Sequence, residues 1–189
     1  MRARLILPGL LAITALTLVG CGTEKSATSS GAAENSPTTS GSSAPAQAGA
    51  GTAAVPEALR FTGTTVDGKP FDAATLAGKP TVLWFWAPWC PKCRAQASET
   101  AKVATEYQDK AHVLGVAGLD KNAAMKDFVS QTGTGSFPHL SDEAGEVWKR
   151  FEVTEQSHYV ILDKDGKTVY EGVLPGGEGL AEKVAGLTG

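Results

Sequence analysis

The chain has no excess of positive charge and very little cysteine. Its 17 lysines and arginines are outnumbered by 20 aspartates and glutamates, which gives a formal net charge of −3. Without a basic excess the chain lacks the electrostatic footprint of a nucleic-acid-binding protein, and we exclude nucleic acid as a partner. The three cysteines, Cys21, Cys90 and Cys93, leave room for only one disulfide within the chain. A length of 189 residues with 42% hydrophobic content suits one globular domain.

The sequence also lacks an apolar run long enough to span a bilayer comfortably. The N-terminal run, residues 5–19, has 15 residues, against the ~20 that a transmembrane helix needs. It follows Arg2 and Arg4, and a basic start before a short apolar core is typical of an export signal. The run ends in Leu-Val-Gly-Cys, which resembles the lipobox of bacterial lipoproteins. We therefore predict a signal peptide over residues 1–20 and lipidation of Cys21. The alternative is an uncleaved anchor or a secreted protein with a free cysteine.

Between residues 22 and 54 there is no Val, Leu, Ile, Phe, Tyr or Trp. Such a segment cannot bury enough apolar surface to offset the chain entropy lost on folding. We expect residues 21–54 to be a lipid-anchored disordered linker, with a typical reach of about 30 Å. The folded domain is expected over residues 55–189.

Strand and helix patterns alternate through residues 55–189. Apolar alternation around Asp67-Gly68 predicts a β-hairpin, and the uninterrupted run at 81–86 is typical of a strand buried on both faces. A second buried strand is expected at 112–118, and a final hairpin turns at Asp165-Gly166. Helices are expected at 91–107, 121–131, 143–151 and 178–187. This order predicts an α/β fold with a central sheet covered on both faces.

Cys90 and Cys93 are separated by Pro91 and Lys92 at the point where a strand gives way to a helix. Proline suits the first position of a helix, which makes Cys90 the residue that caps it. A thiolate at a helix N-terminus is stabilised by the helix dipole and by free N–H groups, and the thiolate is the attacking species. We expect a lowered pKa for Cys90, and a more buried Cys93 that closes or resolves a disulfide.

The motif and its flanks resemble the thioredoxin superfamily, and in particular its TlpA/ResA/DsbE branch of membrane-tethered thiol–disulfide oxidoreductases. The similar stretches are "FDAATLAGKPTVLWFWAPWCPKC", "FPHLSDEAGEVWKRFEV" and "ILDKDGKTVYEGV", and the resemblance covers residues 59–187. It implies a thioredoxin fold whose central mixed sheet has helices on both faces, with an N-terminal β-hairpin and a central insertion. It also implies that Trp89 borders the active site and contacts partners.

The sequence departs from that branch at three positions. The branch has Glu-x-Pro after the second cysteine, where this chain has Gln96 and Ser98, so the proton transfer that the glutamate supports is in doubt. Ser157 stands where the superfamily has a cis-proline, in a loop with Gln156 that faces the substrate. No proline occurs anywhere in residues 141–174. Because a cis bond before serine costs about 3–4 kcal/mol, we expect a trans Gln156–Ser157 peptide.

Other uses of the cysteine pair are less favoured. A copper metallochaperone similar to the Sco proteins would bind metal through Cys90, Cys93 and His158, but its cysteines are spaced CxxxC. A peroxidase needs a Thr-x-x-Cys arrangement, and Ala87 occupies the threonine position. We expect no bound metal and no cofactor beyond the redox-active disulfide itself.

The expected function is disulfide exchange with exported proteins outside the cytoplasm, because that compartment favours disulfide chemistry. Lys92 and the neutral Gln96 both favour the reduced form of the pair, and so an oxidant. The alternative is a reductant in cytochrome c maturation. We expect a monomer that is lipid-anchored to the cell membrane, with exported thiol or disulfide proteins as substrates and a membrane redox partner that resets the site.

Overall fold

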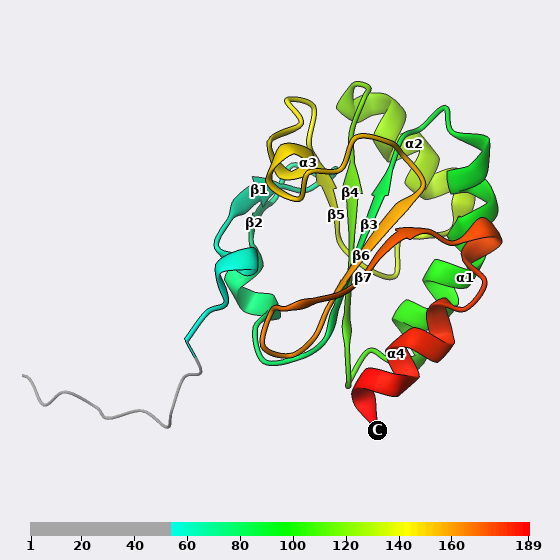
Figure 1. The fold of residues 1–189 in the computed structure, drawn as a ribbon. Coiled ribbons are helices and arrows are strands. Elements are labelled where there is room, and N and C mark those ends of the chain that lie inside the picture. Colours follow the sequence, from blue (N-terminus) through cyan, green and yellow to red (C-terminus); the bar gives the residue numbers. More distant parts are fainter. Residues whose placement is uncertain (1–53) are drawn as a thin grey trace, which may run out of the picture. The chain divides into compact units, whose positions relative to one another are not determined.

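A computed structural model describes residues 54–189, and it is built around a five-stranded mixed sheet (Figure 1). The strand order is β5-β4-β3-β6-β7. β3 pairs in parallel with β4, and β4 with β5, whereas β6 and β7 add in antiparallel fashion. The strands are β3 Thr81–Trp86, β4 His112–Ala117, β5 His139–Ser141, β6 His158–Leu162 and β7 Thr168–Val173.

Helices cover both faces of this sheet, as predicted. One face packs against the longer helices, α1 Pro91–Glu106, α2 Asn122–Thr132 and α4 Leu180–Thr188. The opposite face is covered by α3 Glu146–Arg150 and by two 3-10 turns, η1 Glu57–Leu59 and η2 Ala73–Leu76. An N-terminal hairpin, β1 Thr62–Thr64 with β2 Pro70–Asp72, meets β5 through a bridge between Thr65 and Leu140. The α/β class with helices on both faces is thereby confirmed.

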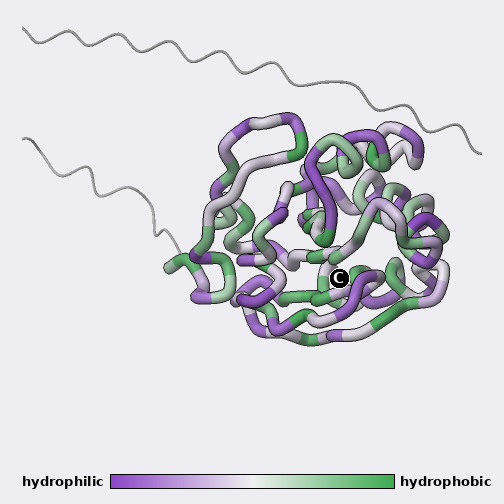
Figure 2. The backbone as a smooth tube through the Cα atoms, turned by 90° about the horizontal axis from the view of Figure 1, so that it is seen from above, coloured by the Kyte–Doolittle hydropathy of each residue, from purple (hydrophilic) through white to green (hydrophobic). Residues whose placement is uncertain are grey.

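Strand β3 lies in the middle of the sheet and is buried along its whole length. Its residues alternate between the two cores, with Trp84 and Trp86 toward α1 and with Leu83 and Phe85 toward α3. Figure 2 shows hydrophobic and hydrophilic stretches alternating along the outer elements, as expected when one side of each packs on a sheet. The continuous apolar run of β3 is thus explained by burial on both faces.

The third helix is shorter than the sequence suggests, beginning at Glu146 rather than at residue 143. Asp142 is the cause, because its carboxylate accepts the N–H groups of Glu146, Val147 and Trp148 at 2.8–3.0 Å. The intervening residues turn through Gly145, whose φ of 70° lies in the left-handed region. The last helix begins at Leu180 for a related reason, since Gly179 precedes it with a φ of 80°.

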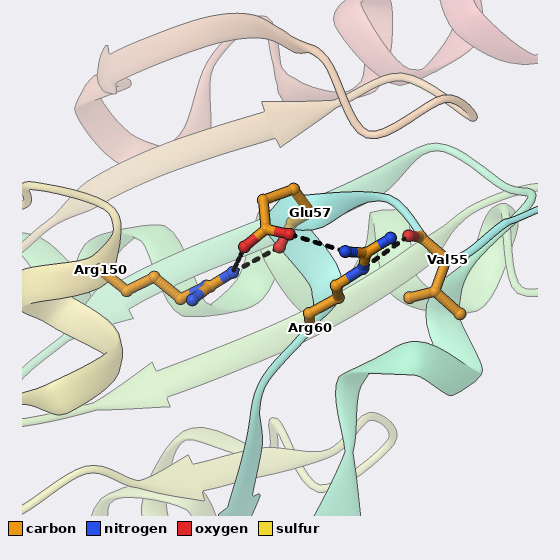
Figure 3. Close-up of polar contacts among 4 residues, drawn as sticks. All are labelled: Val55, Glu57, Arg60 and Arg150. Carbon is orange, nitrogen blue, oxygen red and sulfur yellow. Dashed lines mark hydrogen bonds and ion pairs between the residues drawn. The ribbon is translucent and has the colours of Figure 1, made fainter.

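A small polar cluster fastens the start of the domain to the α3 face (Figure 3). Arg60 donates to the Val55 carbonyl at 3.1 Å and pairs with the Glu57 carboxylate at 3.0 Å. Arg150 at the end of α3 pairs with the other oxygen of that carboxylate and also donates to the Glu57 carbonyl. These are exposed ion pairs, so each contributes roughly 0–1 kcal/mol. The segment packs on the face of the sheet opposite α1 mainly through Leu59, which is buried in the core that contains Leu83 and Phe85.

The predictions for the signal peptide, for lipidation of Cys21 and for all but the end of the linker lie outside the described residues. Within residues 54–189 no helix combines the length and apolar character needed to cross a bilayer.

Candidate active site

Cys90 caps the N-terminus of α1, as the sequence predicts. β3 ends at Trp86, and Cys90 follows in an extended conformation with Pro91 as the first helical residue. The Cys90 sulfur accepts a hydrogen bond from the backbone N–H of Cys93 at 3.0 Å. The sulfur therefore lies at the positive end of the helix dipole, in contact with an N–H group that helix geometry leaves unpaired.

Cys90 and Cys93 form a disulfide across this first turn, with their Cα atoms 5.3 Å apart. Cys93 is fully buried, whereas Cys90 keeps 2% of its surface exposed. A partner thiol can therefore approach this disulfide only at Cys90. The pair has the order expected for exchange, with an outer cysteine that is attacked and an inner one that leaves.

An exposed rim borders the pair. The Trp89 side chain is 54% exposed, and its indole N–H donates to the Leu119 carbonyl at 3.3 Å. Leu119 is itself 53% exposed and has a φ of 61°, which is unusual for leucine. Lys92 is exposed between the cysteines. The rim thus exposes two apolar side chains and one positive charge beside the cysteine pair.

Gln96 lies one turn beyond Cys93 on the same side of α1 and is completely buried. Its Oε1 accepts the indole N–H of Trp84 at 2.9 Å. Its Nε2 donates to the carbonyls of Ser157 and Leu174, both at 2.9 Å. All of these partners belong to other elements, so this side chain joins α1 to β3 and to two loops.

The Gln156–Ser157 segment lies at the end of the sheet where β3 leads into Cys90. The Ser157 N–H donates to the Phe85 carbonyl at 2.9 Å, and β6 begins at the next residue. Ser157 is 1% exposed, its hydroxyl has no hydrogen-bond partner, and its φ is 70°. Proline is locked near −65° and cannot adopt this backbone. Gln156 is half-buried; the trans isomer of the bond between the two residues stays a prediction.

Ser98 is exposed on α1, which runs from Pro91 to Glu106 as one helix. Serine at this position, where the branch has proline, thus leaves the helix uninterrupted.

The structure does not bring His158 to the cysteines. His158 precedes Tyr159 on β6, and Tyr159 packs in the core that contains Cys90 and Cys93. Successive strand residues point to opposite faces, so His158 lies on the other side, where it is 3.6 Å from the Glu171 carboxylate. Within residues 54–189 no three His, Cys, Asp or Glu side chains are grouped closely enough to hold a metal ion. The copper-site alternative therefore lacks its third ligand in this structure.

His139 is buried in the core that also contains Trp86. Its Nδ1 accepts the Trp86 indole N–H at 3.2 Å, and its Nε2 lies 2.9 Å from the Thr134 carbonyl. These partners require a neutral ring with its proton on Nε2. Burial lowers the pKa of His139 to about 4. The ring also fills the space over Gly115, where a Cβ would lie 2.0 Å from Nδ1.

Sequence reasoning named Gln96 as a departure but missed its three bonds, and it missed Leu119 altogether. For Gln96 a clue existed, because a glutamine three residues after Cys93 shares its helical face and must be buried with it. No local sequence pattern predicts that Leu119 is exposed at the site, because its exposure and left-handed backbone are set by the loop between β4 and α2.

A mixed sheet with a helix that begins at a Cys-x-x-Cys disulfide defines a thioredoxin-fold protein with a redox-type cysteine pair. The AhpC/TSA family model matches residues 55–171, and the chain belongs to that family.

The relatives agree with the resemblance to the TlpA/ResA/DsbE branch. The chain is 39% identical to the soluble secreted antigen MPT53 of Mycobacterium tuberculosis over 89 residues, which are 47% of this chain and 50% of the antigen. It is 29% identical to the thiol-disulfide oxidoreductase ResA of Bacillus cereus over 88 residues, 46% of this chain and 50% of ResA. It therefore spans about half the length of these curated relatives.

Two solved structures are similar over nearly their whole length. The structure of MTB DsbF in mixed oxidised and reduced forms shares 40% identity with a TM-score of 0.66, covering 71% of this chain and 99% of that one. A secreted Mycobacterium tuberculosis disulfide oxidoreductase, described as homologous to Escherichia coli DsbE, shares 38% identity with a TM-score of 0.63. That match covers 69% of this chain and 98% of the other. The thioredoxin fold is thereby confirmed.

Proposed function

We propose that this protein is an extracytoplasmic thiol–disulfide oxidoreductase that exchanges disulfides with exported proteins and acts as an oxidant. The observation that carries the proposal is the Cys90–Cys93 disulfide at the N-terminus of α1, with the Cys90 sulfur as the helix cap. Relatives named as disulfide oxidoreductases support the same chemistry.

The exchange proceeds in two attacks. A substrate thiolate attacks the Cys90 sulfur, the Cys90–Cys93 bond breaks, and Cys93 leaves as a thiolate that takes up a proton. A second substrate thiolate then attacks the substrate sulfur that is bonded to Cys90. This forms the substrate disulfide and releases Cys90 as a thiolate. Two electrons pass from the substrate to the cysteine pair, and a redox partner must accept them to restore the disulfide.

Three features support the oxidant direction. The helix N-terminus stabilises the Cys90 thiolate, which favours the reduced pair and makes its disulfide a stronger oxidant. The Lys92 charge acts in the same sense. Gln96 places a neutral amide, not a carboxylate, one turn behind Cys93, so no negative charge at that position opposes a thiolate.

The place of action rests on the N-terminal sequence and on the relatives. A basic, apolar start that ends in a lipobox-like Leu-Val-Gly-Cys supports export, followed by lipid anchoring at Cys21. One relative is named as a soluble secreted antigen, and a similar structure is described as secreted. We infer a monomeric, membrane-anchored enzyme whose substrates are exported proteins with thiols and whose resetting partner is a membrane redox protein.

The direction is tested by the equilibrium reduction potential of the pair against glutathione. The full chain carrying Cys21→Ser leaves Cys90 and Cys93 as its only thiols. An oxidant is expected to have a potential well above that of thioredoxin, which is about −270 mV. A value near that of thioredoxin contradicts the oxidant direction and supports the reductant alternative.

The substrates are tested with Cys93→Ser in the otherwise natural chain. Without Cys93 the mixed disulfide on Cys90 cannot be resolved from within, so exported proteins should accumulate on it as reducible adducts. The matched control is Cys90→Ser, which keeps one thiol but removes the attacked sulfur. If the two variants capture the same proteins or none, disulfide exchange with exported proteins is the wrong function.

A further inference from the structure

Gln96 has a complete set of hydrogen bonds although it is fully buried next to a redox pair. One acceptor oxygen meets one indole N–H, from Trp84, and two amide hydrogens meet two carbonyl oxygens, of Ser157 and Leu174. The reverse amide orientation would face N–H with N–H and oxygen with oxygens, so the assignment is unambiguous. A neutral amide thus fits this environment fully.

A carboxylate would not fit it. An ionised glutamate offers no hydrogen, so both carbonyls would be left buried and unpaired beside a negative charge. A protonated glutamate could donate one O–H and would satisfy only one of the carbonyls. The three partners of Gln96 therefore select an amide over an acid of the same length.

The two carbonyls belong to the segments that border α1 at its cysteine-bearing end. Ser157 precedes β6, where that strand pairs with the end of β3. Leu174 precedes η3 Pro175–Gly177, which packs so closely on α1 that a Cβ on Gly177 would lie 2.8 Å from the Glu99 Cβ. Gln96 thus ties both loops to the helix that carries the disulfide.

The Ser157 segment depends on such a tie. Its backbone is left-handed at a serine, and its hydroxyl lacks a partner, so its local interactions do not fix its position. It is held by its N–H bond to Phe85 and its carbonyl bond to Gln96, together with the pairing of β6 that begins at the next residue.

We propose that Gln96 is a positioning residue, which holds the Ser157 and Leu174 loops against the cysteine pair through hydrogen bonds that do not titrate. The proposal rests on the proposed disulfide exchange and adds to it that the shape of the site does not depend on a carboxyl group behind Cys93. The titratable groups around Gln96 include Tyr159, Glu99 and, in the reduced protein, Cys93 one turn before it on α1. Tyr159 on β6 is hydrogen-bonded to Thr100 at 2.7 Å, and burial raises its pKa. Glu99 on α1 lies 3.9 Å from Lys102.

The test compares Gln96→Met and Gln96→Glu with the wild type in the oxidation of the reduced protein by oxidised glutathione. In that reaction the Cys90 thiolate attacks glutathione disulfide and releases one glutathione. Cys93 then attacks Cys90, releasing the second glutathione and forming the protein disulfide. Rates are measured from pH 5 to pH 9 on the full chain carrying Cys21→Ser. The control is Gln108→Glu, the same charge change at an exposed residue.

Gln96→Met keeps the length of the side chain but removes all three bonds. We expect roughly a ten-fold slower exchange at every pH, with the Cys90 pKa unchanged, because the loops lose their tie while the local charge stays the same. Gln96→Glu should come within a few-fold of wild type at pH 5, where one bond to a loop survives, and fall about ten-fold or more by pH 8. The control should follow the wild type throughout.

Two results overturn the proposal: an unchanged rate in Gln96→Met, or a Gln96→Glu to wild-type ratio that is independent of pH. Failure of the wild type itself to react is a different result, since it contradicts the proposed function and not the role of Gln96.

A measurement on the wild type keeps the proposal testable if both variants fail to fold. The side-chain amide hydrogens of Gln96 should exchange with solvent at least 100-fold more slowly than those of the exposed Gln108, in both the oxidised and the reduced protein. Equal exchange rates for the two side chains in either redox state would show that the bonds do not persist and would overturn the proposal.

Discussion

The start of α1 at Cys90 and the Ser157 segment are joined through Gln96, yet they are held by different kinds of interaction. At Cys90 the conformation follows from adjacent residues, because Pro91 sets the first helical position and the Cys93 N–H reaches the capping sulfur. At Ser157 no motif in the adjacent residues accounts for the backbone conformation. Its left-handed backbone is disfavoured for serine, and its position depends on Phe85 and Gln96.

The difference separates the part of the site that does the chemistry from the part that shapes it. A helix cap is a local motif, and it places its sulfur at the positive end of the helix dipole wherever the motif occurs. A loop held by distant partners varies with those partners, and here they include a residue next to the cysteine pair. Changes at the start of α1 should therefore alter the chemistry of the thiols. Changes at the Ser157 segment should alter the stability of the protein and the access of partners to the disulfide.

The largest loss of stability is expected from Ser157→Pro, which puts a proline into the Ser157 segment. Proline cannot adopt a φ of 70° and has no N–H for the Phe85 carbonyl. The free energy of unfolding should fall by about 3 kcal/mol. Urea denaturation monitored by tryptophan fluorescence measures it. A variant as stable as the wild type would show that the left-handed conformation is not needed, and the contrast between the two regions would disappear.

The pH dependence of stability tests another interaction that depends on distant partners. His139 has a pKa of about 4 in the folded protein against 6.5 for an ordinary histidine. Between these values the unfolded chain binds the extra proton, so stability falls as the pH drops from 6.5 toward 4 and is constant above 6.5 on this account. The expected loss at pH 4.5 is roughly 2–3 kcal/mol relative to pH 7.5.

The measurement is urea denaturation of the wild type and of His139→Gln at pH 7.5 and 4.5. Subtracting the change in unfolding free energy of the variant from that of the wild type removes the contribution of the carboxylates that both proteins share. The control is His112→Gln, at a half-buried position whose pKa is also lowered by burial but which begins β4 at the edge of the core. If His139→Gln loses as much stability on acidification as the wild type, His139 is not the group that titrates.

The same contrast explains what the sequence could reveal. The hairpins, the buried strand β3 and the cap at Cys90 were predictable because period, turn residues and a proline encode them locally. The start of α3 was misplaced because Asp142 reaches past three residues to its N–H groups. The bonds of Gln96 to Ser157 and Leu174 join residues 61 and 78 positions apart. No local sequence pattern spans such a separation. The loops could therefore be located in the sequence, but their conformation and their bonds to Gln96 could not be predicted.

Ser157→Gly should strengthen the second region by removing its strain. Glycine adopts a φ of 70° without steric cost, and the change also deletes a buried hydroxyl without a partner. Glycine also makes the unfolded chain more flexible, so more entropy is lost on folding and part of the gain is offset. We therefore expect the free energy of unfolding to rise by about 1 kcal/mol. Ser157→Ala is the control in chemical denaturation, since it removes the hydroxyl but keeps the strain. A glycine variant no more stable than the alanine variant would show that the backbone is not strained.

The smallest effect is expected on the first region, from Lys92→Glu. Reversing this exposed charge in the first turn of α1 should raise the pKa of Cys90 in the reduced protein by about 0.5 units, because the thiolate loses a positive neighbour and gains a negative one in high dielectric. Thiolate absorbance against pH, in the chain carrying Cys21→Ser, gives the value. Lys102→Glu on the same helix makes the same change 12 residues from Cys90, or about 18 Å along the axis, and screening should leave the pKa unmoved. Equal shifts in both variants would mean that net charge, and not the local helix start, sets the reactivity of Cys90.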